Sequence, residues 1–326
     1  MKREIVALIY GGDSSESEIS VKSGKHIVEH IDRDRYEVYE VMISGKEWRV
    51  LLDDGRAIDI DKSDFSFVLP ESSCRRVNFD KALIMIHGTP GENGLLQAYL
   101  EMVGVPFTSC SAVVSAITFD KYACKCYIRD TGIKLPRECF LRKGSAYSTT
   151  DIVERLGLPL FVKPNNGGSS FGVTKVKVKE ELEKAIEMAF TEDESVLVEE
   201  FIEGREVTNG VYKNGDDFVR LPVTEIISDN EFFDYDAKYL GASKEICPAN
   251  ISDELSGKIV ATSQGLYEYL GCSGVVRFDY ILKGEEIYFL EVNTVPGMTE
   301  MSLVPQQIRS AGMSIKEFLT QLLKAD

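Results

Sequence analysis

The sequence has no apolar run that could cross a membrane. A spanning helix needs roughly 20 consecutive apolar residues, and no stretch of the chain comes near that length. Lys2 and Arg3 precede an apolar run from Ile5 to Tyr10, but Gly-Gly-Asp ends this run too early for a signal-peptide core. We therefore expect a cytoplasmic protein that is neither exported by this route nor embedded.

The sequence also contains fewer basic than acidic residues. Lys and Arg number 37 against 53 Asp and Glu, so the net charge is −16 at pH 7. This balance disfavours non-specific binding to nucleic acid or membranes, so any phosphate must be held by a local site. The chain has 326 residues, of which 44% are hydrophobic and 28% charged, as in a folded protein of two or three domains.

Convincing disulfide and metal patterns are missing. The seven cysteines are odd in number and scattered, which suggests reduced thiols. Cys124 and Cys126 are two apart on a predicted helix and therefore point away from each other. The segment His26–His30 matches the inverted zinc-protease pattern H-x-x-E-H. Its histidines share a helix side with Lys22 and Lys25, opposite the apolar stripe, so we expect solvated surface there.

The familiar nucleotide motifs are absent as well. No G-x-G-x-x-G follows the first predicted strand and no G-x-x-x-x-G-K-[ST] occurs, which removes support for Rossmann and Walker-type sites. The first strand leads instead through Gly11-Gly12 to a predicted helix start near Ser15 and Glu16, where ligands of open α/β sheets tend to bind. Glu16 either binds an ammonium group there or is a first-turn acid favoured by the helix dipole.

Hydrophobic periodicity predicts a mixed α/β and α+β fold. Strands alternate with helices in the first third of the chain, which is typical of a parallel sheet. The expected elements there are strands at 5–10, 36–43 and 82–86 and helices at 21–31 and 95–103. Further on we expect helix at 112–131, a compact α+β unit up to 198, then antiparallel strands, a helix at 253–270, a hairpin at 274–293 and a helical tail.

Two glycine-rich loops follow predicted strands. The loop His87–Gly94 contains three glycines and brings backbone close either to a ligand or to itself in tight turns. The loop Lys163–Gly172 places a lysine beside flexible backbone donors. A lysine charge and successive N–H groups suit a phosphate. A loop without a ligand is the alternative, although a plain hairpin rarely needs this length.

The strongest pattern is a hairpin near the C-terminus. Arg277 and Asp279 share one strand face, and Glu291 and Asn293 share a face of the next strand. A three-residue turn at 283–285 would place Arg277 opposite Glu291. Two carboxylates and an amide oxygen on one face would bind Mg²⁺, with nucleotide phosphates completing its octahedron. A solvent face with salt bridges is the alternative.

These residues and several further segments occur along the chain in the order found in a known protein family. The segments are the His87 loop, Lys163–Gly172, Arg277-x-Asp279, Glu291-x-Asn293, Asn293-Thr294-x-Pro296-Gly297-Met298-Thr299, Glu16-x-Glu18-Ile19-Ser20, Phe232-x-Asp234-Tyr235-x-Ala237-Lys238-Tyr239 and Ser302-Leu303-Val304-Pro305. Over nearly its whole length the chain resembles the D-alanine:D-alanine ligases of the ATP-grasp superfamily. The resemblance implies an N-terminal α/β substrate-binding domain at 1–110, a central ATP-grasp domain at 111–198 and a C-terminal ATP-grasp domain at 199–326.

The same resemblance implies a nucleotide site that uses ATP with two Mg²⁺ ions, or Mn²⁺ in their place. Lys121 and Lys163 would contact the ATP phosphates, and the metal ligands would be Asp279, Glu291 and Asn293. The other contacts with ATP would come from Glu199, Glu200, Phe201, Ile202, Glu206, Phe232 and Lys238. Relatives are commonly dimers, so a homodimer is expected.

For the substrates, the resemblance implies that Glu16 binds the ammonium group of the first D-alanine beside His87. Ser302 and the Leu303 N–H would receive the carboxylate of the second D-alanine. The side chains that would hydrogen-bond with Glu16 and close a loop over both substrates are Ser169 and Tyr239.

The implied reaction has two steps. The first carboxylate attacks the γ-phosphoryl group of ATP and gives an acyl phosphate. The second amine then attacks this intermediate, while Arg277 and the Gly297 N–H stabilise the oxyanion. The product, D-alanyl-D-alanine, would serve the synthesis of peptidoglycan precursors.

Two alternatives stay open. One is a ligase with a different acceptor such as D-lactate, because relatives that make D-alanyl-D-lactate carry a different residue at the position of Tyr239. The other is a regulatory protein that binds a nucleotide or amino acid on the same scaffold. The complete set of lysines and metal-binding residues disfavours the second alternative, since binding alone needs fewer convergent charges.

Overall fold

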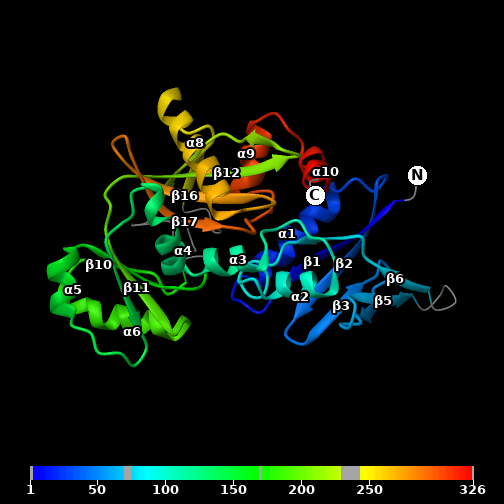
Figure 1. Cartoon of the computed structure of the whole chain (residues 1–326), viewed down its shortest axis with the longest axis horizontal. Coiled ribbons are helices and arrows are strands. Elements are labelled where there is room, and N and C mark those ends of the chain that lie inside the picture. The colour runs from blue at the N-terminus through cyan, green and yellow to red at the C-terminus, as the bar shows by residue number, and fades with distance from the viewer. Residues whose placement is uncertain (1–2, 70–74, 169–170, 229–242, 325–326) are drawn as a thin grey trace.

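Figure 1 shows the computed structural model of the chain, which describes residues 3–69, 75–168, 171–228 and 243–324. Its three larger sheets are arranged along the long axis. The N-terminal sheet and a four-stranded sheet lie at opposite ends, and a six-stranded sheet lies between them (Figure 1). No helix in these described ranges is long and apolar enough to span a bilayer.

The N-terminal sheet is built on a parallel core. Its elements are β1 Glu4–Gly11, α1 Ser17–His30, β2 Tyr36–Ser44, β3 Glu47–Leu51, β4 Ala57–Asp59, β5 Ser66–Leu69, β6 Arg75–Asn78, β7 Lys81–Ile84 and α2 Leu95–Val103. The strand order is β4-β3-β2-β1-β7, and β1 pairs in parallel with both β2 and β7. This confirms the parallel sheet predicted from the alternation of strands and helices. β3 and β4 extend it antiparallel, and β5 pairs with β6 separately.

The four-stranded sheet is antiparallel. Its elements are β8 Glu138–Arg142, α5 Thr149–Leu156, β9 Leu160–Pro164, β10 Thr174–Val176, α6 Leu182–Glu192 and β11 Ser195–Glu200. The strand order is β10-β9-β11-β8. Apolar residues of α5 and α6 and of the strands form one buried cluster, so the helices cover one face of this sheet. Its other face remains available for a ligand.

The six-stranded sheet carries the hairpin identified in the sequence. Its elements are β12 Arg205–Asn214, β13 Asp217–Arg220, β14 Thr224–Ser228, β15 Ser243–Ile246, α8 Asp253–Leu270, β16 Val276–Lys283, β17 Glu286–Asn293, α9 Leu303–Ser310 and α10 Ile315–Lys324. The order is β15-β14-β12-β16-β17, with β13 paired to β12. All of these pairings are antiparallel, as predicted.

The predicted register of the β16–β17 hairpin is wrong. Lys283 pairs with Glu286 across a two-residue turn, and the register shifts between Asp279 and Tyr280. The tight turn uses Gly284 at a φ of +63°, a conformation that glycine adopts readily. Arg277 consequently lies opposite Asn293, and Asp279 lies opposite Glu291. The two carboxylates are therefore direct cross-strand neighbours.

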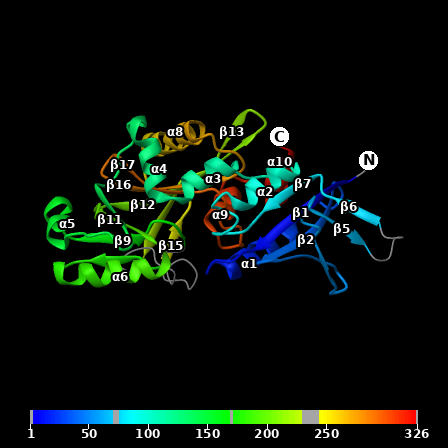
Figure 2. The same ribbon diagram turned by 60° about the horizontal axis from the view of Figure 1, so that its bottom comes forward.

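Two short helices connect the N-terminal sheet to the rest of the chain. They are α3 Ala112–Phe119 and α4 Lys121–Ile128, and with α2 they follow one another across the molecule (Figure 2). Cys124 and Ile128 of α4 pack in the same cluster as Phe278 and Tyr280 of β16. Residues 112–128 thus pack against the six-stranded sheet, whereas the predicted division groups them with the central unit. That division at 110 and 198 stays a prediction.

One hydrophobic core joins the N-terminal sheet to the C-terminal helices. Leu8 of β1, Tyr212 of β12 and Phe318 of α10 belong to the same buried cluster, and the rings of Tyr212 and Phe318 meet edge to face at 5.0 Å. The buried Lys81 ammonium group of β7 also donates to the Leu323 carbonyl at 2.8 Å. This shared core holds the N-terminal loops against the six-stranded sheet.

Candidate active site

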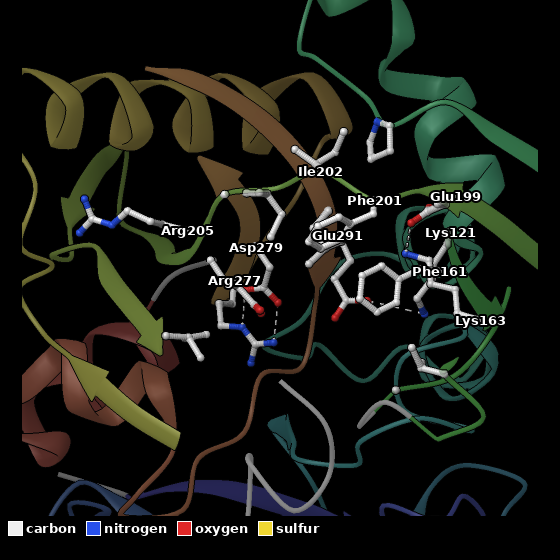
Figure 3. Close-up of a pocket in the computed structure, with 18 of the residues that line it drawn as sticks. Lys121, Phe161, Lys163, Glu199, Phe201, Ile202, Arg205, Arg277, Asp279 and Glu291 are labelled. Carbon is white, nitrogen blue, oxygen red and sulfur yellow. Dashed lines mark hydrogen bonds and ion pairs between the residues drawn. The ribbon is translucent and has the colours of Figure 1, made fainter. Parts of the chain in front are cut away.

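Two adjoining cavities lie where the sheets meet. The larger, of about 530 Å³, lies between the four-stranded and six-stranded sheets (Figure 3). The smaller, of about 220 Å³, lies between α1, the His87 loop and the segment after β17. Arg277, Glu291 and Leu303 line both cavities, so a group bound in one can reach a group bound in the other.

The predicted site residues converge on these cavities. Those that line the larger cavity are Lys121, Lys163, Glu199, Glu200, Phe201, Ile202, Glu206, Arg277, Asp279, Glu291 and Leu303. Those that line the smaller cavity are Glu16, His87, Arg277, Glu291, Asn293, Gly297, Ser302 and Leu303. The other predicted residues, Ser169, Phe232, Lys238 and Tyr239, lie outside the described residues.

Lys163 belongs to a buried network of alternating charges. Its ammonium group lies 2.8 Å from a Glu199 carboxylate oxygen, and the other oxygen of Glu199 pairs with Lys125. Lys125 also lies 3.3 Å from Glu138. Burial would raise the pKa of Glu199, but the two ammonium groups lower it to about 2. Burial lowers the pKa of Lys163 despite Glu199, so an anion that added negative charge would stabilise its protonated form.

The sequence analysis missed Lys125 and Glu138. Lys125 follows Lys121 by one helical turn of α4, a spacing that puts both side chains on one face of the helix. It is completely buried, and a buried lysine needs a charged partner. The i to i+4 spacing of Lys121 and Lys125 was the only sequence feature that could have pointed to Lys125, but lysines on solvated helices show the same spacing.

Replacing Glu199 by glutamine should make the protein less stable in a pH-dependent way. Because the folded-state pKa is lowered from 4.5 to about 2, the carboxylate stabilises the fold above pH 4.5 and loses this effect as the pH falls toward 2. We expect Glu199→Gln to lower the free energy of unfolding by about 3 kcal/mol at pH 7 and by about 1 kcal/mol at pH 3. Urea unfolding at both pH values measures this difference.

Glu194→Gln is the matched control for that measurement. Glu194 pairs with Lys143 at 3.0 Å, but its side chain is 82% exposed, and such pairs contribute at most about 1 kcal/mol. Two results would contradict the buried network as the cause of the lost stability. One is an equal loss of unfolding free energy in both variants. The other is a Glu199→Gln loss that is as large at pH 3 as at pH 7.

Asp279 is held at the centre of the β16–β17 face. Arg277 donates to its two carboxylate oxygens at 2.9 and 2.8 Å, and the Thr208 hydroxyl donates to one of them at 2.6 Å. The Asn293 amide donates to the other oxygen at 3.1 Å. Figure 3 shows Arg277 and Asp279 facing the cavity together. The buried carboxylate is thus oriented toward the space between the sheets. Thr208 is another residue that the sequence analysis missed.

Glu291 and the glycine-rich loop complete the charged wall. The Lys121 ammonium group lies 3.7 Å from a Glu291 oxygen and donates to the Gly167 carbonyl at 2.6 Å. A Cβ atom on Gly168 would lie 2.7 Å from a Glu16 oxygen, so a larger residue there would have to displace that carboxylate. The loop after β9 therefore reaches the carboxylate of Glu16.

The oxygen atoms of Asp279, Glu291 and Asn293 could hold a hard cation only if a bound nucleotide supplied further ligands. Among the residues that the structure describes, no three His, Cys, Asp or Glu side chains are placed to hold a metal ion. Asp279 and Glu291 are cross-strand neighbours, and the amide of Asn293 adjoins Asp279. Mg²⁺ prefers one or two carboxylates with substrate phosphates and waters. The set therefore fits Mg²⁺ carried by a nucleotide.

His87 is bonded through both ring nitrogens within the protein. Its Nδ1 lies 2.8 Å from the Val295 carbonyl, and its Nε2 lies 3.0 Å from the Ser23 hydroxyl. Since a carbonyl only accepts, Nδ1 carries a hydrogen. Burial lowers the pKa of His87, which favours the neutral ring. His87 thus shapes the smaller cavity and has no spare nitrogen for a ligand.

A helix N-terminus contributes to the lining of the smaller cavity. Ser302 occupies the N-cap position of α9, and Leu303 is the first helical residue. The Ser302 hydroxyl accepts the Thr299 N–H at 3.0 Å. The first N–H groups and the dipole of a helix favour an anion. The cavity lining therefore includes a group suited to a carboxylate, at the start of α9, and a group suited to a cation, at Glu16.

Comparisons with known proteins agree with this geometry. Residues 5–110 match the family model described as D-ala D-ala ligase N-terminus, and residues 128–324 match D-ala D-ala ligase C-terminus. The chain is 46% identical to a D-alanine–D-alanine ligase of Phocaeicola vulgatus and 47% identical to one of Bacteroides fragilis, each alignment covering 99% of both chains.

Solved structures show the same fold. The VanG D-Ala:D-Ser ligase of Enterococcus faecalis superposes with a TM-score of 0.88 at 32% identity, covering 99% of each chain. A D-alanine–D-alanine ligase of Bacillus anthracis, solved in complex with ATP, gives 0.79 at 30% identity and covers 99% of this chain and 97% of its own. The matched models span both halves of the chain, and the two cavities unite the residues that carried the resemblance. The chain belongs to the D-alanine–D-alanine ligase family of ATP-grasp enzymes.

Proposed function

We propose that this protein is an ATP-dependent D-alanine–D-alanine ligase that makes the dipeptide for peptidoglycan precursors. The observation that carries the proposal is the pair of adjoining cavities that share Arg277 and Glu291. One has the buried lysines and carboxylates that a magnesium nucleotide requires. The other is lined by both Glu16 and the start of α9, which suit the ammonium group of one amino acid and the carboxylate of another. The curated relatives carry the same name.

In the proposed first step, ATP occupies the larger cavity. Lys121 and Lys163 offset the charge of its phosphates, and Phe201 and Ile202 line the apolar part of the site. Asp279, Glu291 and Asn293 would hold two Mg²⁺ ions, or Mn²⁺, which neutralise the charge that develops on the phosphates. Other contacts with the nucleotide would come from Glu199, Glu200, Glu206, Phe232 and Lys238. The carboxylate of the first D-alanine then attacks the γ-phosphoryl group, forming an acyl phosphate and ADP.

In the proposed second step, the neutral amine of the second D-alanine attacks the acyl carbon. Glu16 holds the ammonium group of the first substrate, and Ser302 with the Leu303 N–H holds the carboxylate of the second. The oxygen of the tetrahedral adduct receives hydrogen bonds from Arg277 and the Gly297 N–H. Phosphate leaves and the peptide bond remains. In the same proposal, Ser169 and Tyr239 bond with Glu16 and close the site.

Three further properties stay proposals. The three-domain division is supported by the three separate sheets, but its boundary at 198 falls within β11 (Ser195–Glu200), and α4 packs against the six-stranded sheet. A homodimer is supported by exposed apolar side chains on α2, where Leu95 and Met102 are 61% and 87% exposed and lie two turns apart. A cytoplasmic location is supported by the need for ATP.

The proposal is tested by phosphate release. Purified protein with Mg-ATP and D-alanine should release phosphate and form one dipeptide for each phosphate, while L-alanine should give no more than background. D-Lactate and D-serine, each added with D-alanine, test other acceptors. No observation in this chain favours D-lactate. ATP binding in the presence of D-alanine without phosphate release would overturn the proposal in favour of a binding protein.

A further inference from the structure

The backbone of residues 295–298, which we name the 295–298 loop, is held by side chains from the N-terminal part of the chain. At its start, the Val295 N–H donates to the Glu92 carboxylate at 3.3 Å, and the Val295 carbonyl accepts from His87 Nδ1 at 2.8 Å. Both polar groups of Val295 are thus satisfied by the His87–Gly94 loop. Glu92 and His87 are both buried.

The end of the loop is held in the same way by α1. The Met298 N–H donates to the Ser23 hydroxyl at 3.1 Å. The Met298 carbonyl accepts from His26 Nδ1 at 2.7 Å. His26 belongs to the H-x-x-E-H segment, for which we expected solvated surface, and that expectation is wrong for this side chain. It is partly buried because the 295–298 loop lies against it.

The hydrogen bonds have one consistent direction. His87 Nδ1–H donates to Val295, so the Nε2 of the neutral ring accepts from the Ser23 hydroxyl. The oxygen of Ser23 then accepts from the Met298 N–H. A single chain of bonds therefore connects the two ends of the loop through Ser23 and His87, which are 0% and 4% exposed.

Gly297 lies between the four bonded groups. A Cβ atom there would lie 2.9 Å from the Ser302 hydroxyl, so the backbone is packed closely against the N-cap of α9. An oxyanion donor acts through its position before the reaction, and an error of 1 Å can cost about 10² in rate. Fixing Val295 and Met298 is a direct way to hold the Gly297 N–H between them.

We propose that Ser23 and His26 are positioning residues that hold the Gly297 N–H on the tetrahedral adduct of the second step. The inference rests on the proposed function, in which Gly297 is an oxyanion donor. It makes α1 part of the catalytic apparatus although Ser23 and His26 act only through the 295–298 loop, to which each of them is hydrogen-bonded. It also gives the N-terminal part of the chain a role beyond binding the first amino acid.

The test uses variants of His26 that separate ring volume from hydrogen bonding. His26→Phe keeps the ring and loses the donor, whereas His26→Asn places an amide N–H near the position of Nδ1. His30→Phe is the matched control: His30 Nδ1 bonds the His26 carbonyl within α1, and phenylalanine keeps the ring that packs against His26 at 4.4 Å. We expect kcat to fall roughly 10- to 100-fold in His26→Phe and in Ser23→Ala. The His26→Asn and His30→Phe variants should stay within about threefold of the wild type.

Two further measurements separate positioning from folding. The dissociation constant for Mg-ATP should be nearly unchanged, because the larger cavity does not include α1. Thermal melting checks that each variant is folded at the assay temperature. Exchange of the β–γ bridging oxygen of labelled ATP, which reports reversible phosphoryl transfer to the first D-alanine, should continue in both slow variants. If Ser23→Ala does not fold, the His26 pair decides the question.

The outcomes distinguish the two proposals. Two results obtained with an active wild type would overturn this inference alone. One is unchanged turnover in His26→Phe. The other is a loss of oxygen exchange in the slow variants that parallels their loss of kcat. A wild type that shows no D-alanine-dependent phosphate release would overturn the proposed function and the inference with it.

Discussion

Arg277→Ala is expected to lower kcat by roughly 10²–10³, the usual effect of removing one oxyanion donor. Arg277 is one of three residues that line both cavities, at whose junction the acyl carbon would lie. The KM for ATP should change little, because in the proposed mechanism the triphosphate is bound by Lys121 and Lys163. Steady-state phosphate release over a range of ATP and D-alanine concentrations measures both quantities.

The structure adds a second reason for a large effect. Arg277 also forms a two-pronged contact with Asp279 at 2.9 and 2.8 Å, so its removal leaves a buried carboxylate with less compensation. Arg277→Lys is the informative control, since lysine keeps the positive charge but cannot donate to both carboxylate oxygens of Asp279 in the same geometry. It should recover only part of the lost rate. Unchanged turnover in Arg277→Ala would remove this residue from the mechanism.

Asp279→Asn is expected to lower activity further, by about 10³ or more at fixed Mg²⁺. A metal ion contributes several kcal/mol of charge stabilisation in phosphoryl transfer, and Asp279 is the most buried of the proposed ligands at 5% exposure. The variant should also need a higher Mg²⁺ concentration for half-maximal rate. Titration of phosphate release with Mg²⁺ and with Mn²⁺ measures both effects.

Glu286→Gln is the matched control for Asp279→Asn. Glu286 lies on the same hairpin but near its tip, where it pairs with Lys134 and is 47% exposed. Its loss should leave the Mg²⁺ dependence unaltered. Thermal melting checks that Asp279→Asn still folds, since Thr208 and Arg277 both donate to Asp279. A folded variant with the Mg²⁺ dependence of the wild type would contradict the assignment of Asp279 as a ligand.

Much of the site could be predicted because its residues follow local patterns. Alternation along β16 and β17 was enough to place Arg277 and Asp279 on one face, since side chains of a strand point alternately to its two sides. The exact pairing was not predictable, because one register shift between Asp279 and Tyr280 changes which residues lie opposite. Nothing in the sequence marks that shift.

Residues that act through distant contacts were harder to predict. Helical periodicity placed His26 on the side of α1 away from the apolar stripe. The periodicity predicts which face of α1 is buried by apolar contacts, but it gives no information about the polar face. It does not show that the loop after β17, some 270 residues away, covers the polar face. Lys125 was missed for a related reason, because its charge resembles that of a solvated lysine until Glu199 and Glu138 are brought beside it.

The sequence by itself determined the kinds of element, the parallel core of the N-terminal sheet and the chemistry available at each loop, because these depend on neighbours along the chain. Only the tertiary structure decided that Lys163 joins a buried network of four charges and that α1 holds the 295–298 loop. Such contacts join residues far apart in sequence. Their strength comes from burial, which is a property of the folded molecule and not of any local segment.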